Sequence, residues 1–183
     1  DQVAWDRSTD ARWPLHTDRR SPMPLIAVPI RTETVIRRTP SVNFSLIAAN
    51  ALVFLLFDAR FAGEGMWAFR ERYLHLLSYE PSFHQFFTYQ FIHADLMHLL
   101  GNMLFLWVFG NSVNSKMGNG PYLLFYLAGG AFAGLGHALF HPNPLAGASG
   151  AVAAVTTAYL ALFPRSRVTV LIWVFLFIHF VEV

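Results

Sequence analysis

The sequence MGNGPYLLFYLAGGAFAGLGHALFHPNPLAGASGAVAAVTTAYLALFP, residues 117–164, contains no Asp, Glu, Lys or Arg in 48 positions. One bilayer crossing needs about 20 apolar residues, so this stretch is long enough for two. It divides at HPNP (141–144), because two prolines around an asparagine cannot continue a helix. We therefore predict membrane-spanning helices over 121–140 and 147–163.

Outward from this stretch, three further apolar runs complete the pattern. Residues 39–57 and 96–115 are uncharged and each is long enough to span. Residues 168–181 are predicted as another membrane helix, which is still apolar where the sequence stops at Val183. Residues 61–95 are aromatic-rich and charged, which favours an interfacial or half-inserted loop. The fold class is thus an all-α polytopic helical bundle.

The overall composition agrees with a membrane protein. The chain is 55% hydrophobic and 13% charged, whereas a soluble domain is about 25% charged. It has no cysteine, which excludes disulfides, thiolate metal sites and a cysteine nucleophile. The net charge of +2 comes from scattered arginines that form no basic face, which argues against nucleic-acid binding.

We predict two parts, a polar N-terminal tail over 1–38 and a transmembrane domain over 39–183. The chain begins at Asp1, and Met23 is a plausible natural start, so residues 1–22 are hypothesised to be non-native. An inside N-terminus leaves six cations of the remaining chain inside against three outside. The six are Arg31, Arg37, Arg38, Lys116, Arg165 and Arg167; the three are Arg60, Arg70 and Arg72.

Polar residues inside a bilayer are costly and suggest function, which singles out His98, Asn102, Ser149 and His179. His98 and Asn102 lie four residues apart, so a helix aims both from one face. Chemistry at a shared point is one interpretation. Hydrogen bonding to each other or to a neighbouring helix is the other.

Ser149 stands in GASG (147–150), after the proline-containing loop and at the start of a predicted helix. A helix N-terminus offers free N–H groups and a positive dipole end, which suits an oxyanion beside a serine nucleophile. The 17 residues of 147–163 span about 25 Å, so the serine should lie below the membrane surface. The alternative is that Ser149 only caps the helix.

The remaining histidines favour structural roles. His93 lies where the aromatic loop meets the helix of His98, and we interpret it as tying loop to helix. His75, His84, His137 and His141 suggest zinc, but no His pair at i, i+4 encloses a helical Glu. We therefore favour interface histidines and predict no metal.

The segments HADLMHLLGNMLFLWVFGN (93–111), MGNGPYLLFYLAGG (117–130) and GASGAVAAV (147–155) together resemble bacterial rhomboid intramembrane serine proteases. The likeness runs from about Arg31 to Val183. It implies a six-helix core with a serine opening the fourth helix and a histidine in the sixth. On this resemblance the sequence holds five helices, the fifth incomplete, and stops before the sixth.

The resemblance implies that Ser149 is the nucleophile of a Ser–His dyad, with Gly147 and Gly150 as motif glycines. His98 and Asn102 would stabilise the oxyanion with the Ser149 N–H, and His93 would support the loop. The family needs no cofactor, and its substrate would be a transmembrane protein within the bilayer, here the bacterial inner membrane. Oligomeric state stays open.

Two departures from the family pattern stand out. The helix with the catalytic histidine is absent, and His179 is a poor substitute because the family places its base on a different helix. Asn114 replaces a frequent glutamate. An inactive rhomboid-like protein that binds transmembrane helices is therefore the alternative function. A transporter or channel would show a repeat or buried charge pairs, and we find neither.

Overall fold

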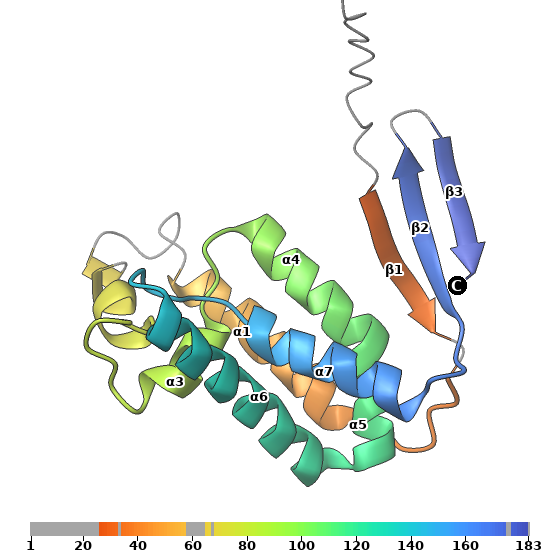
Figure 1. The fold of residues 1–183 in the computed structure, drawn as a ribbon, viewed down its shortest axis with the longest axis horizontal. Coiled ribbons are helices and arrows are strands. Elements are labelled where there is room, and N and C mark those ends of the chain that lie inside the picture. Colours follow the sequence, from red (N-terminus) through yellow and green to blue (C-terminus); the bar gives the residue numbers. More distant parts are fainter. Residues whose placement is uncertain (1–25, 33, 58–64, 67, 175–176, 183) are drawn as a thin grey trace, which may run out of the picture.

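The computed structural model describes residues 26–32, 34–57, 65–66, 68–174 and 177–182. These residues form a bundle of helices with a three-stranded sheet beside one end of it (Figure 1). The helical class predicted from the sequence is confirmed for the bundle. The proposed non-native residues 1–22 and the cation Arg60 lie outside the described residues.

All four internal apolar runs form helices. The first is α1 (Ser41–Phe57). The second is one continuous helix in three parts, α4 (Leu96–Phe105), the π-helical η3 (Leu106–Gly110) and α5 (Asn111–Met117). The third and fourth are α6 (Asn119–Phe140) and α7 (Ser149–Leu162). Residues 96–117 and α6 are each long and apolar enough to cross a membrane, whereas α1 and α7 are shorter.

Glycine and proline set the two breaks around α6. Gly118 separates α5 from α6 with a φ of 85°, a left-handed conformation that suits glycine. The HPNP segment follows α6 directly and forms no helix, as its prolines predict. Each break falls within two residues of the boundary expected from the sequence.

Buried amides join the start of α1 to the 96–117 helix and to α6. Asn43 on α1 donates from Nδ2 to the Leu106 carbonyl and to Asn111 Oδ1, both at 2.9 Å. The Tyr122 hydroxyl of α6 donates to Asn43 Oδ1 at 2.6 Å. Asn114 Oδ1 accepts the Asn43 N–H at 3.0 Å. Asn114, the residue that stands where related sequences often have glutamate, therefore anchors the start of α1. Four elements therefore meet at one polar centre.

Helices α6 and α7 approach closely through small residues. A Cβ added at Gly150 would lie 2.5 Å from Ala133 Cβ, and one at Gly129 would lie 2.6 Å from Ala154 Cβ. Such contacts let two helix backbones come together in a membrane. Gly130 and Gly134 are also four residues apart, as Gly150 and Ala154 are, but they face the side chains of Gln90 and Tyr89 in the aromatic loop.

Large apolar side chains project from the outer surface of the bundle. On α6, Leu124, Phe132 and Phe140 are each more than two-thirds exposed. So many exposed large apolar side chains fit a lipid surrounding better than water.

The aromatic loop between α1 and α4 contains three short helical turns, η1 (Arg70–Leu74), α3 (Gln85–Thr88) and η2 (Tyr89–Phe91). Leu76, Tyr89 and Ile92 of this loop are fully buried. The loop packs along the start of α7 and the end of α6 (Figure 1). It is therefore part of the bundle, as expected for a half-inserted loop.

The predicted fifth helix over 168–181 is wrong. This run forms β2 (Val168–Val174) and β3 (Phe177–Glu182), which pair antiparallel. On its other edge β2 pairs with β1 (Ile26–Thr32), a segment of the predicted tail. The sequence VTVLIWV is rich in β-branched residues, and hydropathy alone cannot distinguish a strand from a helix in such a run.

Candidate functional site

A groove between α4 and α7 brings together Ser149, His98 and Asn102. Its volume is about 520 Å³ and it is open on one side. The other lining residues are small or apolar: Met97, Gly101, Phe105, Val152, Ala153, Thr156 and Thr157. Three of the four polar residues that the sequence singled out are thus neighbours in space, although Asn102 and Ser149 are 47 positions apart in the chain.

Ser149 is the first residue of α7 and its side chain is exposed to the groove. The N-cap position is occupied by Ala148, and no side chain caps this helix. Among the described residues, the Ser149 hydroxyl has no hydrogen-bond partner. The capping alternative is therefore not realised, and the first N–H groups of α7 stay available to a ligand.

Gly147 holds the turn that precedes the serine. Its φ is 127°, and its N–H donates to the Tyr89 carbonyl at 2.9 Å. A Cβ at this position would lie 2.7 Å from His98 Cε1. The imidazole of His98 therefore packs directly on the backbone of the GASG segment, which only a glycine permits.

The helix that carries His98 and Asn102 begins with its own cap. Asp95 is the N-cap of α4 and its Oδ1 accepts the His98 N–H at 2.8 Å. This bond fixes the first turn, so His98 is presented to the groove from a defined helix start. The spacing of four residues then places Asn102 one turn further along the same face.

His93 is buried and connects the two sides of the groove, because it bonds both to α4 and to the residue before α7. Its Nε2 accepts from Asn102 Nδ2 at 3.1 Å and from the Ala148 N–H at 3.5 Å. Burial and then the charge of His98 lower the pKa of His93 to about 4, against the opposing effects of the Phe91 carbonyl and Asp95. A neutral imidazole is what two such donors require.

The aromatic loop also holds the GASG segment in place. Leu76 and Leu145 exchange two backbone hydrogen bonds, at 3.0 and 2.9 Å. The Tyr89 hydroxyl donates to the Gly130 carbonyl at 2.7 Å, and its burial raises the pKa of Tyr89 to about 12. Leu76, Leu145 and Tyr89 were missed by the sequence reasoning, because an aromatic loop has no periodic pattern to mark them.

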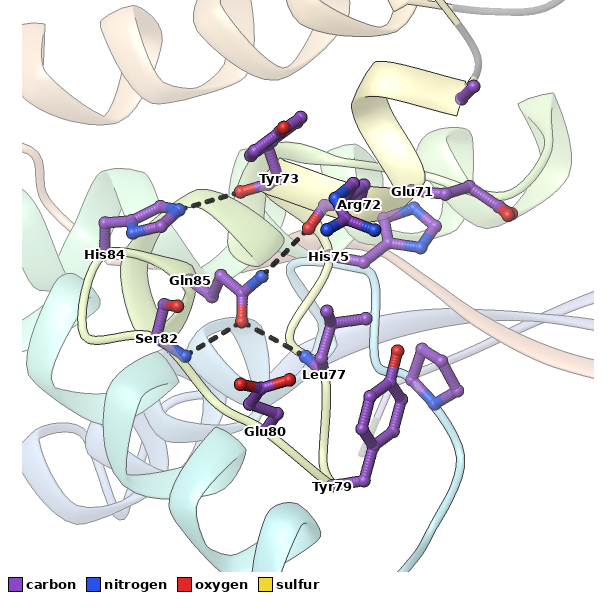
Figure 2. A pocket seen from close by; sticks show the side chains of 12 residues that line it. Glu71, Arg72, Tyr73, His75, Leu77, Tyr79, Glu80, Ser82, His84 and Gln85 are labelled. Carbon is purple, nitrogen blue, oxygen red and sulfur yellow. Dashed lines mark hydrogen bonds between the residues drawn. The ribbon is translucent and has the colours of Figure 1, made fainter.

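A second pocket lies within the aromatic loop and includes none of the predicted site residues. Figure 2 shows that its centre is Gln85, whose Oε1 accepts the N–H groups of Ser82 and Leu77 at 3.0 and 3.4 Å. His75 and His84 line it, yet no group of three His, Cys, Asp or Glu that could hold a metal occurs in the described residues. We interpret it as the internal scaffold of the loop.

The groove contains one histidine within the described part of the chain, and that residue is His98. His179 is in β3, opposite Ile172 of β2. That strand lies beyond the C-terminal end of α7, whereas Ser149 is at its N-terminal end (Figure 1). His179 is therefore not brought to the serine.

Fold and groove together define a class, namely helical membrane proteins with a serine at the opening of a short helix, facing a His and an Asn on a neighbouring helix. Comparison with known families agrees, since a rhomboid domain model matches residues 80–183, more than half of the chain. The chain belongs to the rhomboid family. It is accordingly an integral membrane protein.

Several curated relatives share this match. The rhomboid protease GluP of Bacillus subtilis is 32% identical over 116 residues, covering 62% of this chain and 23% of the relative. Rhomboid protein 1, mitochondrial, of Saccharomyces cerevisiae is 30% identical over 139 residues, covering 71% and 39%. The rhomboid protease GlpG of Yersinia pestis is 29% identical over 68 residues, covering 37% and 24%. The chain thus spans well under half of these relatives.

Proposed function

We propose that this protein is an intramembrane serine endopeptidase that cleaves transmembrane segments of other membrane proteins. The observation that carries the proposal is the groove in which Ser149, at the start of α7, faces His98 and Asn102. Relatives named as rhomboid proteases support it. The proposed location is the bacterial inner membrane with the N-terminus inside.

In the proposed reaction Ser149 Oγ attacks a peptide carbonyl of the substrate. The developing oxyanion accepts hydrogen bonds from the Ser149 N–H, the His98 ring and Asn102 Nδ2. One N–H of the Asn102 amide donates to His93, which leaves the other for the oxyanion. His93 thereby orients the amide as a positioning residue.

The proton of Ser149 needs a general base, which then protonates the departing amine before water releases the acyl group. We assign this role to a histidine of a sixth helix, as the resemblance to rhomboid proteases implies. In the described part of the groove the one histidine is His98, which is proposed to stabilise the oxyanion, and His179 is in the distant sheet. The substrate must present an extended backbone, so it unwinds near small or helix-breaking residues at the open side of the groove.

An inactive rhomboid-like protein that binds transmembrane helices is the second candidate. The specific observation in its favour is that the described part of the groove offers no second histidine as a base. Binding without cleavage would use the same open, mostly apolar groove.

A cleavage assay distinguishes the two. The natural reading frame, extended past Val183, is expressed, reconstituted in liposomes and mixed with a model transmembrane substrate. Cleavage that disappears in Ser149→Ala and persists in Ser45→Ala, an exposed serine on α1, is the expected result. Cleavage unaffected by Ser149→Ala would reject the assignment of the nucleophile. Substrate retention without any cleavage would support the binding protein.

A further inference from the structure

A basic groove lies at the opposite end of α7 from Ser149, where α5 and α7 both end (Figure 1). Its volume is about 750 Å³. Three separate segments line it, namely residues 34–38, the end of α5 and the turn after α7. No Asp or Glu is among its lining residues in the described part of the chain. Four cationic residues line it: Arg37, Arg38, Lys116 and Arg165.

Hydroxyl groups fix the backbone that carries two of these arginines. Ser115 Oγ accepts the N–H groups of both Arg37 and Arg38, at 2.9 and 3.0 Å. One turn earlier, the Ser112 hydroxyl bonds to the Thr34 hydroxyl. Both serines are buried, so the segment is attached to α5 at two points. The arginines are therefore presented at the groove from an anchored backbone.

The other two sides of the groove are equally defined. The Arg38 guanidinium lies near Gly118, where a Cβ would be 3.5 Å from Nη1. Beyond α7, Ser166 N–H closes a turn on the Phe163 carbonyl at 3.0 Å. The Tyr159 hydroxyl donates to Ser166 Oγ at 2.7 Å, which ties this turn back to α7. The Arg165 side chain is carried on this closed turn.

We propose that this groove binds the phosphate of an anionic phospholipid headgroup. Guanidinium, ammonium and hydroxyl groups are the donors that phosphate oxygens prefer. The groove lies at the ends of apolar helices, which is the depth of headgroups, and the apolar side chains of Val35 and Leu162 at its rim are exposed. Basic pockets between helix ends bind such headgroups.

Basic residues at helix ends are common and also determine membrane orientation. That role requires only that the charges lie on one side of the bilayer. It does not require convergence of three chain segments on one cavity, nor the serine bonds that attach residues 34–38 to α5. A cavity formed by three anchored segments is therefore evidence for a binding site, beyond the role of the charges in membrane orientation.

Native mass spectrometry of the full chain in neutral detergent tests the proposal. Phosphatidylglycerol is titrated against phosphatidylcholine, and the double variant Lys116→Gln with Arg165→Gln is compared with the unmodified chain. We expect the preference for phosphatidylglycerol to fall about tenfold, since the two cations removed line the groove and would contact a bound headgroup directly. The charge-preserving pair Lys116→Arg with Arg165→Lys should keep the preference, which guards against loss through misfolding.

The matched control is Arg31→Gln with Arg72→Gln, which removes the same net charge from exposed positions that do not line the groove. Its preference should change by less than about twofold. Equal weakening in both double variants would overturn the proposal in favour of diffuse surface charge. Inorganic phosphate that binds the chain as well as the lipid does, and displaces it, would overturn the assignment to a lipid.

Discussion

Gly147 is the residue on which the shape of the serine turn depends most directly. Its positive φ and the adjacent His98 ring leave no room for a side chain. Any other residue would have to move either the GASG backbone or the imidazole. Both movements would change how Ser149 and His98 face each other.

Gly147→Ala should therefore lower the free energy of unfolding by about 2 kcal/mol. An alanine side chain would strain the positive-φ backbone and would collide with the His98 ring. The measurement is thermal unfolding in detergent followed by near-UV circular dichroism. Gly136→Ala is the control, since a Cβ there meets nothing within 4 Å. Unchanged unfolding of Gly147→Ala would contradict the turn described.

His93 makes a prediction about pH. Its pKa is lowered from 6.5 to about 4 in the folded protein, first by burial and then by His98. Between these values the unfolded chain binds more protons, so the stability from the neutral imidazole is complete above pH 6.5 and decreases as the pH falls toward 4. Between pH 6.5 and 5 the loss should be about 2 kcal/mol.

The test is denaturant unfolding of the unmodified chain and of His93→Asn at pH 7.5 and 5.0. The variant should lose less stability on acidification. His75, whose pKa is also lowered to about 4 by burial and then by Arg70, is present in both proteins and cancels in the comparison. Identical pH dependence in the two proteins would show that His93 is not buried as neutral imidazole.

At the scale of elements, the π-helical segment η3 explains how α1 joins the bundle. Asn43 donates to the Leu106 carbonyl at the start of this segment. A side chain that bonds within a helical ladder is a known cause of such irregularity. Gly110 at its end leaves the space that the Asn43 side chain occupies. The irregular turn and the buried amide therefore depend on each other.

The sheet makes an equally specific prediction, because β1 and β2 have a defined register. Val28 pairs with Leu171, and Cα atoms of directly paired residues are about 4.5–5.5 Å apart, a distance that a disulfide can bridge. Since the chain has no cysteine of its own, Val28→Cys with Leu171→Cys should crosslink efficiently on mild oxidation. Intact-mass measurement detects the loss of two hydrogens.

The control is Val28→Cys with Val174→Cys, three residues out of register and about 10 Å apart along the strand. It should crosslink poorly. Similar yields from both pairs, or none from either, would contradict the pairing of β1 with β2 and restore a helix over 168–181.

At the scale of the whole molecule, the sequence predicted the parts of the fold that hydrophobicity alone determines. The four helices followed from uncharged runs bounded by Gly118 and the HPNP segment. The run from Val168 was misjudged because its partner, β1, is more than 130 residues away and is part of a tail that seemed polar. Pairing across such a distance has no local signature.

The candidate site shows the same division. His98, Asn102 and Ser149 could be found because each is polar within an apolar run, and the groove joins them. The supports in the aromatic loop, Leu76 and Tyr89, act through backbone and hydroxyl contacts to Leu145 and Gly130. The loop contains many other apolar and aromatic residues, so residue type alone could not identify Leu76 and Tyr89 as the supporting ones.

The contacts of this loop with the GASG segment also have a consequence for biosynthesis. A ribosome releases the chain from its N-terminus, so Leu76, Tyr89 and His93 enter the membrane before Leu145, Gly147 and Ala148. All three later residues form hydrogen bonds to those earlier ones. Helix α7 thus reaches the membrane after the loop that holds its first turn, and a nascent chain cannot assemble the groove until α7 has left the translocation machinery.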